Sequence, residues 1–244
     1  MHSGTYRFAG RTVRINSIYE TIHKMCSGYE ADGEADLEVN TTQENIELER
    51  VKSAAEEEKE GIPHVEYTDD YLETLAVDRQ IADRMCEYDT ILFHGSVIAV
   101  DGEAFLFTAK SGTGKSTHTK LWRKYFGERA YMVNDDKPLL RITDKQVIAC
   151  GTPWDGKHHL SRNTEVPLKG LCILERAEKN SIVPVTKREA YDMLVQQVYR
   201  PCEPQRMIKV LKLIDRLAAN VSLYRLGCNM DIEAAETAYN GMKG

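Results

Sequence analysis

One stretch of the chain combines residue types that bind phosphate groups. It reads AKSGTGKST over residues 109–117 and follows a short apolar run. Its glycines allow the backbone to curl so that successive N–H groups point at anionic oxygens, and the start of a helix adds its positive end. The spacing therefore predicts a phosphate-binding loop of the G-x-x-x-x-G-K-[ST] type, although the first position is Ala109 rather than glycine.

The residues of this loop have separate expected tasks. We expect Lys115 to reach the β- and γ-phosphates of a nucleotide and Ser116 to place its hydroxyl on Mg²⁺. A chance glycine-rich turn is the alternative. The set predicted to hold the phosphates is Ser111, Gly112, Thr113, Gly114, Lys115, Ser116 and Thr117.

Two adjacent carboxylates follow the next apolar run. Residues 131–133 predict a short strand, and Asp135 and Asp136 come just after it. An acid at the end of such a strand is placed to hold Mg²⁺, and a second acid can accept the proton of an attacking hydroxyl. We assign Asp135 as the proton acceptor and Asp136, with Ser116, as the metal ligand. The two roles could be exchanged, and a solvated turn is the alternative.

A loop rich in cationic and aromatic side chains is expected over residues 151–165, where glycine and proline interrupt the pattern. Such a loop suits the capture of a substrate beside a transferring phosphate. An ordinary exposed basic loop is the alternative, and two neighbouring histidines alone do not make a metal site. The candidate residues are Trp154, Lys157, His158, His159 and Arg162.

The flanking segments predict the elements that must position these side chains. Asp101-Gly102 between two apolar runs predicts a two-residue hairpin whose second strand enters the loop. A strand at 90–93 places His94 near this hairpin, although a lone histidine is more often structural. Thr186 and Glu189 have capping-box spacing and predict the start of a helix. Further strands are expected at 139–142, 147–150, 166–175 and 222–226, and further helices at 69–87 and 204–219.

The first 62 residues differ in composition from the rest. Residues 5–22 alternate like a strand pair with a turn at Gly10 and Arg11. Residues 29–61 are crowded with Glu and Asp, so we expect an exposed, partly mobile segment, with a solvated helix as the alternative. We therefore predict an N-terminal β and acidic extension over 1–62 and a larger domain over 63–244.

The overall composition limits the classes of function. The chain has 244 residues, of which 42% are hydrophobic, enough for the core of an α/β domain. Its net charge of −6 argues against non-specific binding to nucleic acid or to an anionic membrane. No apolar run approaches membrane-spanning length. With no signal-peptide pattern and six scattered cysteines, we expect a cytoplasmic protein with reduced thiols.

The segment FHGSVIAVDGEAFLFTAKSGTGKST at 93–117 and the VNDD run at 133–136, with the order of the later elements, resemble the HPr kinase/phosphorylase and PEP-carboxykinase-like P-loop kinases over about residues 90–228. The resemblance implies a mixed β-sheet flanked by helices, ATP on the loop, and Mg²⁺-assisted transfer to a hydroxyl. It also implies active-site roles for His94 and for Asp135 or Asp136. In that family an arginine from a later loop stabilises the transferring phosphate, and Arg162 is the candidate. Members often form oligomers, so a homo-oligomer is an expectation.

Together these features predict an ATP-dependent kinase. It would transfer the γ-phosphoryl group to a hydroxyl of a small molecule or to a serine of a peptide or protein, with Lys115, Asp135, His94 and Arg162 as catalytic residues. The alternative is a nucleotide-binding regulatory protein that switches without phosphotransfer. The two differ in whether bound ATP is consumed.

Overall fold

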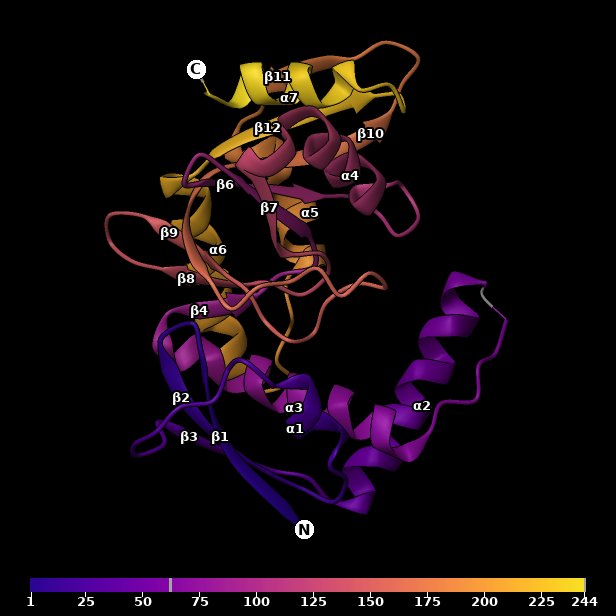
Figure 1. The fold of residues 1–244 in the computed structure, drawn as a ribbon, viewed down its shortest axis with the longest axis vertical. Helices are drawn as coiled ribbons and strands as arrows, with labels where there is room; N and C mark the ends of the chain where they lie inside the picture. The colour runs from indigo at the N-terminus through magenta and orange to yellow at the C-terminus, as the bar shows by residue number, and fades with distance from the viewer. Residues whose placement is uncertain (62, 244) are drawn as a thin grey trace. The chain divides into compact units, whose positions relative to one another are not determined.

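The chain consists of two compact units. The computed structural model describes residues 1–61 and 63–243, and it divides into Met1–Arg84 and Met85–Gly244 (Figure 1). This division differs from the sequence-based boundary after residue 62, because helix α3 (Asp69–Met85) packs within the first unit. Its buried Glu73 accepts hydrogen bonds from the backbone N–H groups of Ile18 at 2.7 Å and Tyr19 at 2.8 Å.

The first unit contains a three-stranded sheet with the order β1-β2-β3. Strands β1 and β2 are antiparallel, and Ala9 and Gly10 join them with positive φ angles of 49° and 76°. The predicted strand pair is therefore confirmed, with its turn one residue earlier than expected. The elements of this unit besides α3 are β1 (His2–Phe8), β2 (Arg11–Ser17), α1 (Thr21–Met25), β3 (Leu37–Asn40) and α2 (Gln43–Glu60).

The acidic segment forms helix α2 over most of its length. Thr42 begins the helix in a capping box with Asn45, in which each side chain binds the other residue's backbone N–H. Glu49 is buried and forms a two-point ion pair with Arg79, at 2.6 and 2.8 Å. Over Gln43–Glu60 the structure thus has the helix that was the alternative prediction, stabilised by its cap and by a buried ion pair.

The second unit is built on a mixed nine-stranded sheet. Its main path has the order β4-β8-β9-β10-β6-β5-β7, and β12 pairs with both β10 and β11. Strand β10 is parallel to β6 and β12, whereas β5 is antiparallel to β6 and β7. The strands are β4 (Thr90–Leu92), β5 (Ser96–Val100), β6 (Glu103–Thr108), β7 (Ala130–Asn134), β8 (Leu139–Ile142), β9 (Val147–Cys150), β10 (Glu165–Arg176), β11 (Ser181–Pro184) and β12 (Ser222–Cys228).

Helices flank this sheet on both faces (Figure 1). Helices α4 (Lys115–Phe126) and α7 (Glu233–Lys243) pack on one face, and α5 (Lys187–Gln197) and α6 (Pro204–Asn220) pack on the other. Side chains of β6 alternate between the two apolar clusters: Phe105 and Phe107 face α4, while Ala104 and Leu106 face α5 and α6. The predicted mixed sheet flanked by helices is confirmed.

The hairpin that leads into the glycine-rich loop has the predicted turn. Asp101 and Gly102 have positive φ angles of 52° and 84°, as expected for the two central residues of a type I′ turn. The guanidinium of Arg129 donates to the carboxylate of Asp101 at 3.0 Å and ties the turn to the start of β7. The hairpin thereby directs β6 into the loop.

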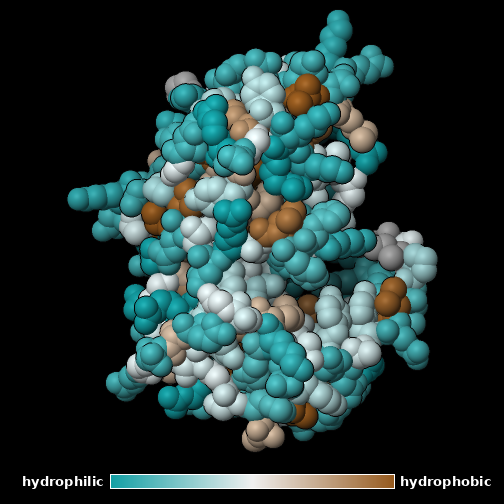
Figure 2. All heavy atoms as spheres, viewed as in Figure 1, coloured by the Kyte–Doolittle hydropathy of each residue, from teal (hydrophilic) through white to brown (hydrophobic). Residues whose placement is uncertain are grey.

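The surface carries scattered rather than continuous apolar side chains on the face shown in Figure 2, where hydrophilic residues dominate. Single exposed apolar side chains are normal on a protein surface. Among the described residues, no helix has both the length and the apolar character needed to cross a membrane.

Helix α4 carries a buried histidine, His118, one turn after the glycine-rich loop. Its Nε2 accepts a hydrogen bond of 3.0 Å from the indole Nε1 of Trp122, and its ring meets Phe107 edge-on with centroids 4.5 Å apart. Burial lowers the pKa of His118 to about 4. The imidazole is therefore neutral in the folded protein at physiological pH.

The buried His118 should make the stability of the protein sensitive to acid. We expect the free energy of unfolding to fall by about 2 kcal/mol from about pH 7 to pH 5, because this histidine becomes protonated in the unfolded chain. The unfolded chain, with an ordinary histidine pKa near 6.5, takes up a proton in this range, whereas the folded chain does so only near pH 4. The contribution is complete above about pH 6.5 and is lost toward pH 4. Urea unfolding at both pH values should show a smaller loss for His118→Gln, and an equal loss would contradict the prediction.

Candidate functional site

The glycine-rich loop lies between the end of β6 and the start of α4, as predicted. Gly112 and Gly114 have φ angles of 72° and 121°, which residues with a Cβ rarely adopt. Lys115 is the first residue of α4, so the positive end of the helix faces the loop. The loop thus has the backbone conformation and the setting in which anionic groups bind.

Arg176, at the end of β10, holds this loop from outside. Its Nη2 donates to the carbonyl oxygen of Gly112 at 2.7 Å, and its Nε donates to that of Thr113 at 3.4 Å. These two bonds fix the course of the loop at Gly112 and Thr113. Sequence reasoning missed Arg176; the available signal was a cation at the end of the strand predicted at 166–175.

His94 and Asp136 form a pair beside the loop. The Nε2 of His94 lies 3.3 Å from Oδ1 of Asp136, and the two side chains are 41% and 36% exposed. Two backbone contacts bring them together: the N–H of Gly95 donates to the carbonyl of Asp136 at 3.0 Å, and Thr108 donates to the carbonyl of His94 at 3.0 Å. The end of β6, the start of β5 and the acidic turn therefore meet at one place.

The charge of Asp136 is stabilised by its surroundings. Burial raises the pKa of its carboxyl, but the hydrogen bond and charge interaction with His94 lower it. The positive charges of Lys137 and Lys115 act in the same direction, so the pKa of Asp136 lies below its ordinary value. The carboxylate is therefore ionised at neutral pH and lies within electrostatic reach of the lysine that begins α4.

Asp135 points the other way and is buried. Its Oδ1 accepts a hydrogen bond of 2.5 Å from the hydroxyl of Ser96, which lies 3.1 Å from the hydroxyl of Thr119 on α4. Its Oδ2 lies toward Gly156, where an added Cβ would come within 3.0 Å of it. The two acids thus face different partners: Asp136 faces His94, and Asp135 faces the first turns of α4.

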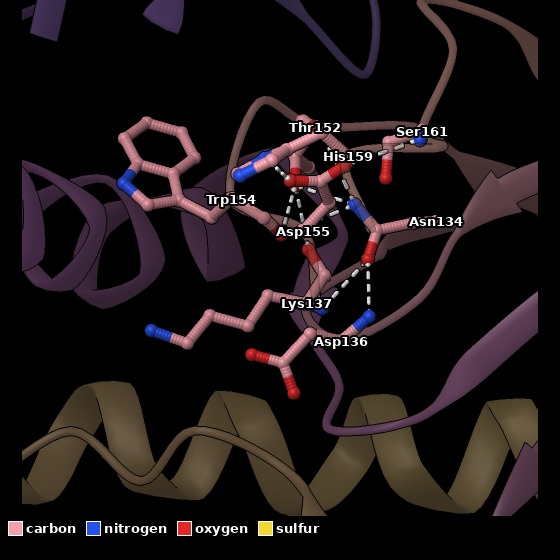
Figure 3. A network of polar contacts seen from close by, with 8 residues as sticks. All are labelled: Asn134, Asp136, Lys137, Thr152, Trp154, Asp155, His159 and Ser161. Carbon is pink, nitrogen blue, oxygen red and sulfur yellow. Dashed lines mark hydrogen bonds and ion pairs between the residues drawn. The ribbon is translucent and has the colours of Figure 1, made fainter. Parts of the chain in front are cut away.

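Asn134 fixes the acidic turn to the loop that follows β9 (Figure 3). Its side-chain oxygen accepts from the N–H groups of Asp136 at 2.8 Å and Lys137 at 2.7 Å. Its amide nitrogen donates to the carbonyls of Thr152 and Trp154, both at 3.2 Å, and lies 2.9 Å from the hydroxyl of Thr152. This fully buried side chain therefore determines where the acids sit.

Replacing Asn134 should loosen the turn. We expect Asn134→Ala to lower the free energy of unfolding by about 2–4 kcal/mol, because buried N–H and carbonyl groups lose their partners. Urea unfolding measures this loss. Thr143→Ala, which removes an exposed turn contact elsewhere in the unit, is the control and should cost less. Equal costs for the two variants would contradict the central position given to Asn134.

The loop over residues 151–163 lies directly on the acidic turn. Asp155 anchors it: Oδ1 pairs with Nδ1 of His159 at 2.9 Å, and Oδ2 accepts from the N–H of Ser161 at 3.1 Å. Trp154 is buried, and its indole points away from Asn134 in Figure 3. Three of the predicted substrate residues are exposed on the loop: Lys157, His158 and His159.

The backbone of Gly151 lies very close to the backbone of Arg162 and of Val133. Its N–H donates to the carbonyl of Thr164 at 2.9 Å, and a Cβ at this position would lie 1.8 Å from the carbonyl oxygen of Arg162 and 2.8 Å from that of Val133. Only glycine permits this packing, which brings the two ends of the loop together against β7.

The backbone N–H of Arg162 donates to the carbonyl of Val133 at 3.3 Å, but its side chain extends toward the start of β7. Its guanidinium carbon is 5.0 Å above the ring centre of Tyr131, the second residue of that strand. The structure therefore brings together the loop, Lys115, His94 and Asp136, with Asp135 behind them, and it holds Arg162 on a separate aromatic surface.

A Mg²⁺ ion is compatible with these residues. No group of three or more His, Cys, Asp or Glu side chains in the described part of the chain could hold a metal. Mg²⁺ does not need one, because it commonly takes one or two carboxylates together with substrate phosphates and water. The exposed hydroxyl of Ser116 on the first turn of α4 and the carboxylates of the acidic turn are the oxygen donors that such an ion prefers.

Comparisons with known proteins place the chain in a family. A search of curated proteins gave no match. Among solved structures, the Hpr(Ser) kinase/phosphatase from Coxiella burnetii is similar with a TM-score of 0.37 and 10% sequence identity, over 63% of this chain and 99% of that one. A likeness this weak does not establish a shared fold. The family model described as SynChlorMet cassette protein ScmC matches residues 66–233, and the chain belongs to this family.

Proposed function

We propose that the protein is an ATP-dependent kinase that transfers the γ-phosphoryl group to a hydroxyl of a small molecule or of a serine side chain. The proposal depends on one observation: the His94–Asp136 pair lies within electrostatic reach of Lys115, at the end of the glycine-rich loop. The loop would cradle the phosphates, and Lys115 would neutralise charge that develops during transfer. An ionised carboxylate beside them supplies a proton acceptor, which a protein that only binds nucleotide does not need.

The exposure of Asp136 supports exchanging the roles first assigned to the two acids. A general base must reach the hydroxyl whose proton it takes. Asp136 is 36% exposed and is oriented by His94, whereas Asp135 is buried against Ser96 and the Gly156 segment. In our proposal Asp136 accepts the proton, and His94 holds its carboxylate in place.

Asp135 and Ser116 would then hold Mg²⁺. Asp135 is linked through Ser96 to Thr119 of α4, the helix whose first turn carries Ser116. When bound, the ion would neutralise charge on the phosphates of the donor. Lys157, His158 and His159, on the loop above the acids, are the proposed contacts for the acceptor. Arg162 would have to leave Tyr131 to reach a transferring phosphate.

The test is ATP consumption by the purified protein with Mg²⁺, measured separately with a pool of small hydroxyl compounds and a pool of serine-containing peptides. Turnover that depends on one pool would support the kinase and identify the acceptor class. ATP that binds and is never consumed with either pool would count against phosphotransfer and favour the regulatory alternative.

A further inference from the structure

A hollow of about 530 Å³ adjoins the glycine-rich loop on its β10 side. Its size falls in the range of small-molecule sites. One wall is the first half of the loop, the second is the end of β10, and the third is Met193 on α5. The lining residues are Lys110, Ser111, Gly112, Thr113, Ile173, Leu174, Glu175, Arg176 and Met193.

The chemistry of this hollow suits a flat ring with polar edges. Ile173 and Met193 provide apolar contact, and a thioether packs favourably against aromatic rings. The guanidinium of Arg176 is held in place by the carbonyls of Gly112 and Thr113, and a fixed planar guanidinium can stack on an aromatic face. A nucleobase has such faces, and its edge can bond to the polar groups of the rim.

The position of the hollow agrees with this chemistry. In the sheet, β6 lies between β10 on one side and β5 with β7 on the other. The acids and His94 lie on the β5 and β7 side, and the hollow lies on the β10 side. If the last phosphate of a bound donor faces the acids, the opposite end of the donor extends from the loop toward β10.

We infer that the hollow beside β10 binds the nucleoside part of the phosphate donor, with Met193 against the base. This inference rests on the proposed function, since it assumes that the loop holds the phosphates. A second hollow along α4 competes for the same role. It is lined by Thr117, Lys120, Leu121, Arg123, Lys124 and Met230, and three cations make it less suited to an uncharged base.

The experiment separates nucleoside contacts from phosphate contacts. Dissociation constants for ATP and for inorganic triphosphate, both with Mg²⁺, are measured for the wild type and for variants. We expect Met193→Ala to weaken ATP about ten-fold and to leave triphosphate within about two-fold, because only ATP carries a base. Met193 is only partly buried, and Met193→Leu should restore ATP binding without disturbing the helix.

Two further variants serve as controls. Arg176→Ala should weaken both ligands, because it releases the loop that holds the phosphates. Met230→Ala, in the hollow along α4, should change neither. Loss of ATP affinity in Met230→Ala rather than Met193→Ala would overturn the inference, as would equal weakening of ATP and triphosphate by Met193→Ala. A wild-type protein that binds neither ligand would overturn the proposed function together with the inference.

Discussion

Lys115→Ala should lower ATP turnover by at least about 10³-fold, because cations that stabilise the transferring phosphoryl group contribute on that scale. Lys115 begins α4, and its charge acts on Asp136. The other lysine whose charge acts on Asp136 is Lys137, which lies in the acidic turn and not in the loop. The fold should persist, since the lysine is partly exposed and outside the apolar clusters. Steady-state turnover and the unfolding midpoint measure the two effects.

The matched control is Lys120→Ala. This lysine is exposed on the same helix, and it is not among the charges that lower the pKa of Asp136. Its turnover should stay within about two-fold of the wild type, as for most surface substitutions. A Lys115→Ala protein with undiminished ATP consumption would remove the basis for the proposed kinase.

The two acids should fail in different ways when they are replaced. Asp136→Asn should lower the turnover number by about 10²–10⁴-fold while ATP still binds, because the proton acceptor is lost and the loop is intact. Asp135→Asn should raise the Mg²⁺ concentration needed for half-maximal turnover, because one ligand loses its charge. Turnover measured across a Mg²⁺ titration distinguishes these effects.

Stability measurements are needed to separate an effect on Mg²⁺ binding from an effect on folding. Asp135 is buried and bonded to Ser96, so its replacement also affects folding. Ser96→Ala removes the same hydrogen bond without removing the carboxylate, and it should reproduce the loss of stability but not the change in Mg²⁺ requirement. If Asp135→Asn abolishes transfer at saturating Mg²⁺ while Asp136→Asn shifts the Mg²⁺ requirement, the roles are those first expected from the sequence.

Much of the second unit could be predicted because its signals are local. Asp101-Gly102 requires positive φ at adjacent residues, and the turn has them. Thr186 and Glu189 bond reciprocally at the start of α5, as their spacing predicts. The glycines of the loop likewise act through their own backbone angles. In each case a few neighbouring residues determine the conformation, so a single sequence is sufficient.

The remaining features depend on contacts between distant segments. In the sequence, Asn134 looks like one residue of a polar turn. Its bonds to Thr152 and Trp154 depend on the packing of the loop after β9 against β7, which the sequence does not indicate. Arg176 lies 64 residues after Gly112 in the sequence, and the parallel pairing of β10 with β6 brings them together. Helix α2 was misjudged because composition was given more importance than its cap and its ion pair with α3.

Gly151 has a consequence for how the family can vary. Because a methyl group there would overlap the carbonyl of Arg162, a relative that keeps this loop course must keep glycine at this position. A relative with another amino acid must separate the two ends of the loop, and the segment that carries Lys157 and His158 would then take a different course. Position 151 is thus a diagnostic site for grouping relatives by the shape of the loop that follows β9.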